Sequence, residues 1–135
     1  MSKLVAIVQC DLVCRKCAGF ACMNSFYNKE GAFKDYPEDT KYISFTCGGC
    51  CGKGLALKLE DLTHKLKKNN IPLEDVTVHL ASCIVSDSYH NPPCPHRDYI
   101  KAVIERKGFT YKLGSYQSKR TQAKRDAGIY KQWDE

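Results

Sequence analysis

The stretch KLVAIVQ, residues 3–9, is apolar without a break from Leu4 to Val8. A strand that is buried on both faces has this pattern, because helices cover both sides of a parallel sheet. Gln9 and Asp11 end the apolar run and no cleavage site follows, so the pattern predicts a strand and not a signal peptide. We therefore expect residues 3–9 to form a buried strand of an α/β fold.

Three more strand-like runs follow along the chain, at residues 42–46 (YISFT), 76–81 (VTVHLA) and 109–113 (FTYKL). Helical patterns lie between them, which gives the alternation β-α-β-α-β-α-β. This alternation is typical of a parallel sheet with flanking helices and right-handed crossovers. We predict a single α/β domain with a mostly parallel four-stranded sheet, in a three-layer arrangement of the flavodoxin-like or Rossmann-like type.

The helices are indicated by periodicity and by end signals. Four leucines fall at i, i+4, i+7 and i+11 and form one helical stripe, which Asn69, Asn70 and Pro72 terminate. A second helix is expected after Pro95, with Gly108 at its end, and a third over residues 18–27. The expected core-facing residues of the first two helices are Leu55, Leu59, Leu62, Leu66, Ile100, Val103 and Ile104.

The charge is concentrated at one end of the chain. Residues 97–135 carry ten Lys and Arg against five Asp and Glu, whereas residues 1–96 carry eleven against ten. We therefore divide the chain into an α/β domain, residues 1–114, and a basic extension, residues 115–135. The extension suggests docking to a second copy or to an acidic protein; nucleic acid is not favoured, because few aromatic residues are interleaved with the basic ones. No apolar window is long enough to span a membrane.

Nine cysteines in 135 residues is an unusual content. The count is odd, there is no export signal, and the hydrophobic content of 43% is sufficient for a core without disulfides. We expect a reducing, cytoplasmic environment in which the cysteines serve metal or redox chemistry.

The cysteines fall where the predicted strands end. Parallel strands have their carboxyl ends on the same edge of a sheet, which is the edge where open α/β sheets bind ligands. The thiols are therefore expected to converge on one rim, with His96 close to them. The candidates that follow the first strand are Cys10, Cys14, Cys17 and Cys22; those after the second are Cys47, Cys50 and Cys51; and those after the third are Cys83 and Cys94.

The segment SFTCGGCCGKG, residues 44–54, admits three interpretations. Its thiols suit a metal ion or cluster, with Gly48 and Gly49 allowing a sharp turn that directs backbone N–H groups at a bound anion or sulfur. Cys47 and Cys50 also suit a redox-active dithiol at a strand-to-helix turn, and buried thiols can serve packing alone. The thiols that follow the other strands favour the metal or cluster interpretation.

The spacing Cys10-x3-Cys14-x2-Cys17 resembles the loop that holds a [4Fe–4S] cluster in radical S-adenosylmethionine enzymes, although this chain is too short for their barrel. Thiolates suit both zinc and iron–sulfur clusters, so both remain open. Among the other histidines, we expect His79 in the core, His64 on a solvated helix face and His90 on a surface loop.

An ordered set of motifs resembles the CGGC-domain family of small bacterial and archaeal proteins, from about residue 3 to residue 113. The motifs are Cys10, Lys16-Cys17-Ala18-Gly19, Gly31-Ala32-Phe33, Thr46-Cys47-Gly48-Gly49-Cys50, Ala81-Ser82-Cys83 and Cys94-Pro95-His96. Members are suspected metal binders, usually of zinc. The resemblance implies Cys10, Cys17, Cys47, Cys50, Cys83, Cys94 and His96 as ligands, with Cys14, Cys22 and Cys51 as additional candidates. Cys51 stands where the family commonly has a proline, and Cys14 is an addition to the family pattern.

Overall fold

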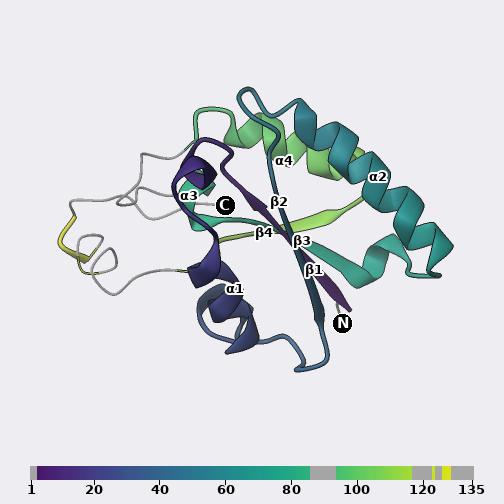
Figure 1. The fold of residues 1–135 in the computed structure, drawn as a ribbon, viewed down its shortest axis with the longest axis horizontal. Coiled ribbons are helices and arrows are strands. Elements are labelled where there is room, and N and C mark those ends of the chain that lie inside the picture. The colour runs from purple at the N-terminus through teal and green to yellow at the C-terminus, as the bar shows by residue number, and fades with distance from the viewer. Residues whose placement is uncertain (1–2, 86–93, 117–122, 124–125, 129–135) are drawn as a thin grey trace.

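The computed structural model describes residues 3–85, 94–116, 123 and 126–128. Its centre is a four-stranded sheet in the order β2-β1-β3-β4, in which every pair of neighbours is parallel. The predicted parallel α/β fold is therefore confirmed (Figure 1). The strands are β1 (Leu4–Gln9), β2 (Lys41–Thr46), β3 (Val76–Leu80) and β4 (Thr110–Leu113).

The helices form the outer layers of the domain. Helices α2 (Gly54–Lys68) and α4 (Arg97–Arg106) cover one face of the sheet, and α1 (Phe20–Tyr27) covers the other (Figure 1). A one-turn helix, α3 (Ser82–Val85), follows β3 directly and was not predicted from the sequence. Three short 3₁₀ turns complete the described elements: η1 (Val13–Arg15), η2 (Gly31–Phe33) and η3 (Leu73–Asp75).

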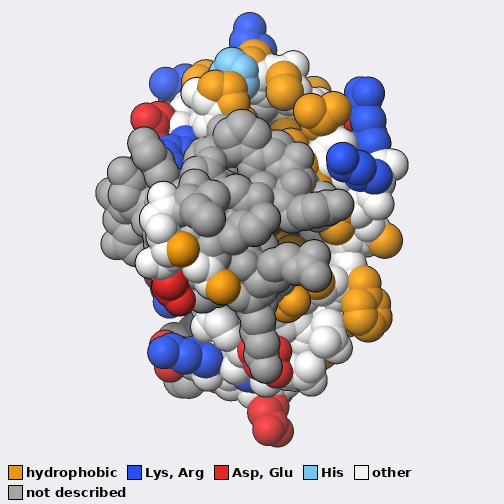
Figure 2. All heavy atoms as spheres, turned by 90° about the vertical axis from the view of Figure 1, so that its left-hand side faces the viewer, with side chains coloured by type: hydrophobic (Ala, Val, Ile, Leu, Met, Phe, Trp, Pro, Cys, Tyr) orange, Lys and Arg blue, Asp and Glu red, His pale blue; other side chains and the backbone are white. Residues whose placement is uncertain are grey.

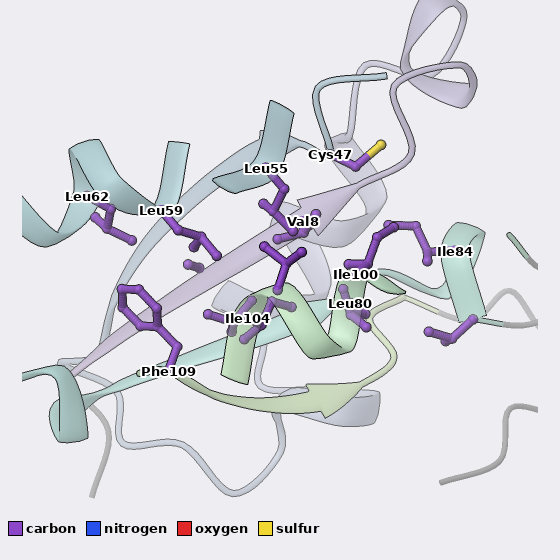
Figure 3. Close-up of a cluster of buried hydrophobic side chains, with 14 of the residues drawn as sticks. Val8, Cys47, Leu55, Leu59, Leu62, Leu80, Ile84, Ile100, Ile104 and Phe109 are labelled. Atoms are coloured by element: carbon purple, nitrogen blue, oxygen red, sulfur yellow. The ribbon is translucent and has the colours of Figure 1, made fainter. Parts of the chain in front are cut away.

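The larger core lies between the sheet and the pair α2 and α4. All four leucines of the predicted stripe are buried there, as are the three predicted apolar residues of α4. Each such side chain stabilises the fold by about 1.5–3 kcal/mol through the apolar area that it removes from water. Figure 3 shows Leu55 and Leu59 of α2 together with Ile100 and Ile104 of α4 and the strand residues beneath them.

The smaller core lies on the α1 side of β1 and β3. Phe26 and Phe33 are fully buried, with ring centroids 5.6 Å apart, and they pack against Val5, Ile7 and Ala81. Alternate residues of β1 thus face the two cores, Val5 and Ile7 toward α1, and Ala6 and Val8 toward α2 and α4. The prediction that β1 is buried on both faces is confirmed.

A histidine is buried on the α1 side of β3, as the sequence predicts. The Nδ1 atom of His79 lies 3.0 Å from the carbonyl oxygen of Gly114, and Nε2 lies 2.6 Å from the hydroxyl of Tyr36. A carbonyl only accepts hydrogen bonds, so Nδ1 carries the hydrogen and the Tyr36 hydroxyl donates to Nε2. Burial lowers the pKa of His79 to about 4, the hydrogen bond to Gly114 opposes this shift, and the charge of Lys112 adds to it.

The remaining predictions concern two histidines, the helix after the first strand, the basic extension and membrane-spanning helices. His64 is exposed on α2, as predicted, and the helix predicted over residues 18–27 begins at Phe20, after Gly19 with φ +81°. His90 and most of the basic extension lie outside the described residues. Within the described part of the chain, no helix has the length and apolar character needed to cross a membrane.

We predict that acid destabilises the protein through His79. The unfolded chain takes up a proton near pH 6.5, whereas the folded protein does so near pH 4, so this contribution is complete above pH 6.5 and is lost as the pH falls to 4. The loss is on the order of 3 kcal/mol. Urea unfolding at a series of pH values should show a flatter pH dependence for His79→Gln than for the native chain, while His64→Gln should keep the native slope. Equal slopes for His79→Gln and the native chain would contradict the assignment.

Candidate metal centre

The ends of β1 and β2 fix the first two thiols of the site. The Cys47 N–H donates to the carbonyl oxygen of Gln9 at 2.9 Å and so continues the β1–β2 ladder one residue beyond the strand. Cys10 and Cys47 are both buried, with 8% and 5% of their surface exposed, and both belong to the larger core. In Figure 3, Cys47 lies close to Leu55 at the beginning of α2. Sheet register therefore places these two cysteines, as the sequence predicts.

Backbone contacts bring Cys83 and Cys94 to the same edge. The Cys10 N–H donates to the Sγ atom of Cys83 at 3.4 Å, which joins the end of β1 to the start of α3. The Cys94 N–H donates to the carbonyl oxygen of Ile84 at 2.7 Å, which holds Cys94 beside α3. The sulfur of Cys94 in turn accepts the backbone N–H of His96 at 3.4 Å. The start of α3 therefore lies beside the end of β1, and the segment that contains Cys94 lies beside α3.

The loop after β1 carries the next group of thiols in a tight turn. The Cys14 N–H donates to the Cys10 carbonyl oxygen at 3.0 Å, and the Cys17 N–H donates to the Val13 carbonyl oxygen at 2.9 Å. The Cys14 thiol donates to Oε1 of Gln9 at 3.6 Å. Cys22 follows on α1 and is half-buried. This loop therefore folds back over the end of its own strand.

The CGGC loop closes against the start of α2 through two glycines. A Cβ atom on Gly48 would lie 2.7 Å from Cα of Gly54, and one on Gly54 would lie 2.9 Å from Cα of Gly48. Gly48 also has φ +79° and Gly49 has φ +96°, conformations in which a side chain is strained. The sharp turn that the sequence predicts is present. The contact with Gly54 was not predicted, although the four glycines within residues 48–54 were a signal for it.

A chain of hydrogen bonds ties the CGGC loop to the loop after β1. The Gly48 N–H donates to Oγ1 of Thr46 at 3.2 Å, and the Thr46 hydroxyl donates to Oδ1 of Asp11 at 2.9 Å. The sequence analysis expected the Gly48–Gly49 turn to direct backbone N–H groups at a bound anion or sulfur, but in the structure the Gly48 N–H donates to Thr46. Thr46 was named only as part of the family motif and Asp11 was not identified, because their contact joins two loops that lie 35 residues apart in the sequence.

Burial and mutual repulsion keep three of the thiols protonated at neutral pH. Burial raises the pKa of Cys83 to about 12, with smaller increases from the nearby thiolates of Cys22, Cys10 and Cys14 and an opposing effect from the Cys10 N–H. Burial also raises the pKa of Cys14, as do Cys17, Cys10 and Cys22. A bound cation would relieve this repulsion, because each thiolate raises the free energy of its neighbours.

The pKa of Cys94, which precedes α4, is also raised. Burial raises its pKa, the His96 N–H opposes the increase, and Cys10, Cys47 and Cys50 raise it further. Cys10 is therefore an electrostatic neighbour of both Cys83 and Cys94. The thiols of the first, second and third loops interact with one another at one edge of the sheet.

The convergence is not a finished coordination sphere. In the described ranges, which include all nine cysteines, no three His, Cys, Asp or Glu side chains are arranged to hold a metal ion. None of the nine cysteines forms a disulfide; Cys50 is exposed, and Cys51, Cys17 and His96 are half-buried. The donor types fit a soft metal, since thiolates and imidazole are its preferred ligands. Figure 2 shows the side of the molecule that lies on the left of Figure 1. Hydrophobic side chains, a class that includes cysteine in this figure, are visible there, as are Lys and Arg side chains.

Comparison with known proteins identifies the family. The sequence model of the CGGC domain matches residues 4–116, nearly the whole chain. The chain belongs to the CGGC-domain family. It is also 31% identical over 101 residues to the "Uncharacterized protein MJ0582" of Methanocaldococcus jannaschii, covering 70% of each chain. No solved structure matches it.

Membership in the CGGC-domain family and the nine cysteines together fit a metal-binding role. The match ends at residue 116, and Ser115 is fully buried, with its N–H donating to Oγ of Ser82 at 3.0 Å. The segment directly after β4 is therefore packed into the fold of the domain.

We predict that Thr46→Val loosens the CGGC loop while leaving the sheet folded. Valine has nearly the same shape but neither donates to Asp11 nor accepts from Gly48, so the free energy of unfolding should fall by on the order of 1–2 kcal/mol. Alkylation of Cys47, followed by mass spectrometry, should become faster. Thr46→Ser keeps the hydroxyl and is the matched control, which should behave as the native chain does. Native alkylation rates in Thr46→Val would show that these hydrogen bonds do not hold the loop.

Proposed function

We propose that the protein binds a metal ion or cluster, either zinc or an iron–sulfur cluster, through thiolates at the carboxyl edge of its sheet. The proposed ligands come from the loops after β1, β2 and β3 and from the segment before α4. Gly48 and Gly49 shape the loop between Cys47 and Cys50. The ligands are Cys10, Cys17, Cys47, Cys50, Cys83, Cys94 and His96, with Cys14, Cys22 and Cys51 available in addition.

The convergence of thiols from separate segments carries this proposal. Cys10, Cys47, Cys83 and Cys94 come from different loops, yet backbone hydrogen bonds to β1 and α3 hold them at one edge. Cys10 and Cys47 belong to the larger core, but that core is made mostly of leucine, isoleucine and valine, so packing does not require thiols at this edge. A structural zinc site is normally built from one or two local knuckles, whereas these ligands are spread over the fold. The arrangement therefore favours a functional centre.

The residues allow a simple account of what binding requires. Each ligand thiol gives up its proton to solvent, and the metal takes the place of that proton at sulfur. The raised pKa values of Cys83, Cys14 and Cys94 make this exchange pH-dependent, with weaker binding in acid. A bound centre of this type supplies Lewis-acid chemistry if it is zinc, or electron transfer if it is iron–sulfur.

A thiol–disulfide oxidoreductase that uses Cys47 and Cys50 is the second candidate. The exposure of Cys50 favours it, because an attacking thiolate must be accessible. Two observations count against it: Cys47 is buried, and α2 begins only at Gly54, so that the helix N-terminus lies beyond the dithiol. The effect of a helix dipole falls off within its first turn.

The residue content also suggests a cellular location and a type of binding partner. Nine cysteines that serve metal or redox chemistry are typical of a reducing compartment, so we place the protein in the cytoplasm. The basic residues after Tyr116 are proposed to dock to a second copy of the chain or to an acidic protein, through contacts that salt weakens.

Protein purified without oxygen should contain zinc or iron, and Cys47→Ser or Cys50→Ser should remove or loosen it. The fold should survive, because serine is a poor ligand for a soft metal but fills nearly the same space. Elemental analysis, acid-labile sulfide and a visible spectrum measure the centre, and brown colour with sulfide selects iron–sulfur. Unchanged metal content with a loss of about 1 kcal/mol would mark these cysteines as packing residues. Absence of metal from gently handled native protein would favour the dithiol candidate.

Removing residues 117–135 should leave the metal content unchanged. Ser115 stays in place, and every proposed ligand lies between Cys10 and His96. Metal analysis and light scattering of the full and truncated chains measure the two effects. A change in assembly state with unchanged metal would support docking through the extension, whereas loss of metal would show that the extension closes the site.

A further inference from the structure

A pocket of about 320 Å³ lies over β3 and β4, on the face of the sheet that carries α1. Thr77 of β3 and Thr110 of β4 are partners in the sheet register, and both line the pocket. Because alternate residues of a strand point to the same face, Thr77 shares the face of His79, whose ring lies 4.7 Å from that of Phe33 in the smaller core. Pockets that bind small molecules have volumes of about 300–1,000 Å³, so this pocket can hold a small ligand.

Tyr36 forms a fixed wall of the pocket. Its hydroxyl donates to Nε2 of the fully buried His79 at 2.6 Å, and the two ring centroids are 5.5 Å apart. Nζ of Lys112 lies over the Tyr36 ring, 5.3 Å from its centroid. Since His79 is enclosed by the smaller core, the wall is in place before a ligand binds. A preformed pocket loses less conformational entropy when it is occupied.

The pocket also carries three charged side chains, those of Asp35, Glu74 and Lys112, all of them exposed residues. Within the described residues, none of the three takes part in an ion pair. The neighbouring Asp75, by contrast, pairs with Lys3 at 3.7 Å. Two carboxylates and an ammonium that share a pocket without pairing leave positions for the charges of a ligand.

The sheet register separates the positive from the negative end of the pocket. Lys112 is the register partner of His79 and lies two residues beyond Thr110, which corresponds to about 7 Å along the strand. Glu74 lies in η3, which directly precedes β3. Glu74 therefore joins the pocket before the level of Thr77, and Lys112 joins it after that level.

We propose that this pocket binds a small zwitterion, an amino acid whose ammonium and carboxylate stand at the two ends of a short alkyl chain. The carboxylate of the ligand pairs with Lys112, and its ammonium pairs with Glu74. The alkyl chain lies against Tyr36 and Pro37, which line the pocket between the charges. Asp35 gives the pocket an excess of negative charge, so a ligand must bring a positive group and an anion alone is disfavoured.

The proposed pocket is separate from the thiol edge. Glu74 precedes β3, whereas the candidate metal ligands follow the ends of strands or precede α4. Among the described residues, the lining of the pocket includes no cysteine. The inference therefore goes beyond the proposed metal-binding function, and either of the two can fail without the other.

The test is a titration of the full chain with 5-aminopentanoate, followed by two-dimensional amide NMR spectra. The signals of Thr77, Thr110 and Lys112 should shift and saturate. Pentylamine and pentanoate each carry one of the two charges of this ligand. Each should bind more weakly by roughly tenfold or more, because it forms only one of the two charge-assisted contacts.

Two variants connect the binding to the pocket. Glu74→Gln and Lys112→Gln should each weaken the binding of 5-aminopentanoate by roughly tenfold or more, since each removes one charged partner. Glu60→Gln and Lys67→Gln are the matched controls, because they make the same charge changes at exposed positions of α2, which covers the other face of the sheet. Both controls should bind as the native chain does, and circular dichroism establishes that each variant is folded.

Three results would overturn the proposal. One is the absence of saturable shifts when the native chain is titrated with 5-aminopentanoate. Another is an equal affinity for pentylamine or pentanoate, and the third is native affinity in both Glu74→Gln and Lys112→Gln. Lys112→Arg keeps the positive charge and should restore binding, so a loss in this variant as well would show that the Lys112 charge is not what holds the ligand. These results do not bear on metal content, so the proposed function would stand.

Discussion

The parallel pairing of β1 with both β2 and β3 is the constraint on which the rest of the structure depends. Because β1 lies inside the sheet and all its neighbours run in the same direction, every loop that follows a strand must leave from one edge. Cys10 and Cys47 lie directly beyond paired strand ends, so the register of backbone hydrogen bonds determines where they meet. The apolar faces of β1 make this pairing favourable, since both cores are built on that strand.

Gathering thiols at one edge has an electrostatic cost that depends on protonation. As neutral groups they pack as small apolar side chains, and Cys10 and Cys47 do so within the core. Burial is the main reason that Cys83 and Cys94 hold their protons more strongly than an isolated thiol does, and repulsion between thiolates adds to it. The same edge therefore packs as apolar side chains while its thiols are protonated and suits a cation when they ionise, and family membership fits a metal-binding role.

The sequence predicted the features that follow from local periodicity. The leucine stripe of α2, the apolar face of α4 and the buried strand β1 each carry their signal within a few residues. The common edge then followed from topology. What could not be predicted depends on contacts between distant loops: the Asp11–Thr46–Gly48 chain, the Gly48–Gly54 approach and the bond from Cys94 to Ile84. The role of Ser115 was hidden in the same way, since its partner Ser82 is 33 residues away.

The position of β1 inside the sheet also matters while the chain is being synthesised. Translation begins at the N-terminus, so β1, α1 and β2 emerge from the ribosome before β3 exists, together with every cysteine except Cys83 and Cys94. Until β3 pairs with it, β1 has an open edge, and Cys10 lacks the neighbour that its backbone N–H contacts in the finished protein. The nascent chain thus exposes most of its thiols together with an unpaired strand. Cellular thiol reductants and chaperones would have their greatest effect on this protein during that interval.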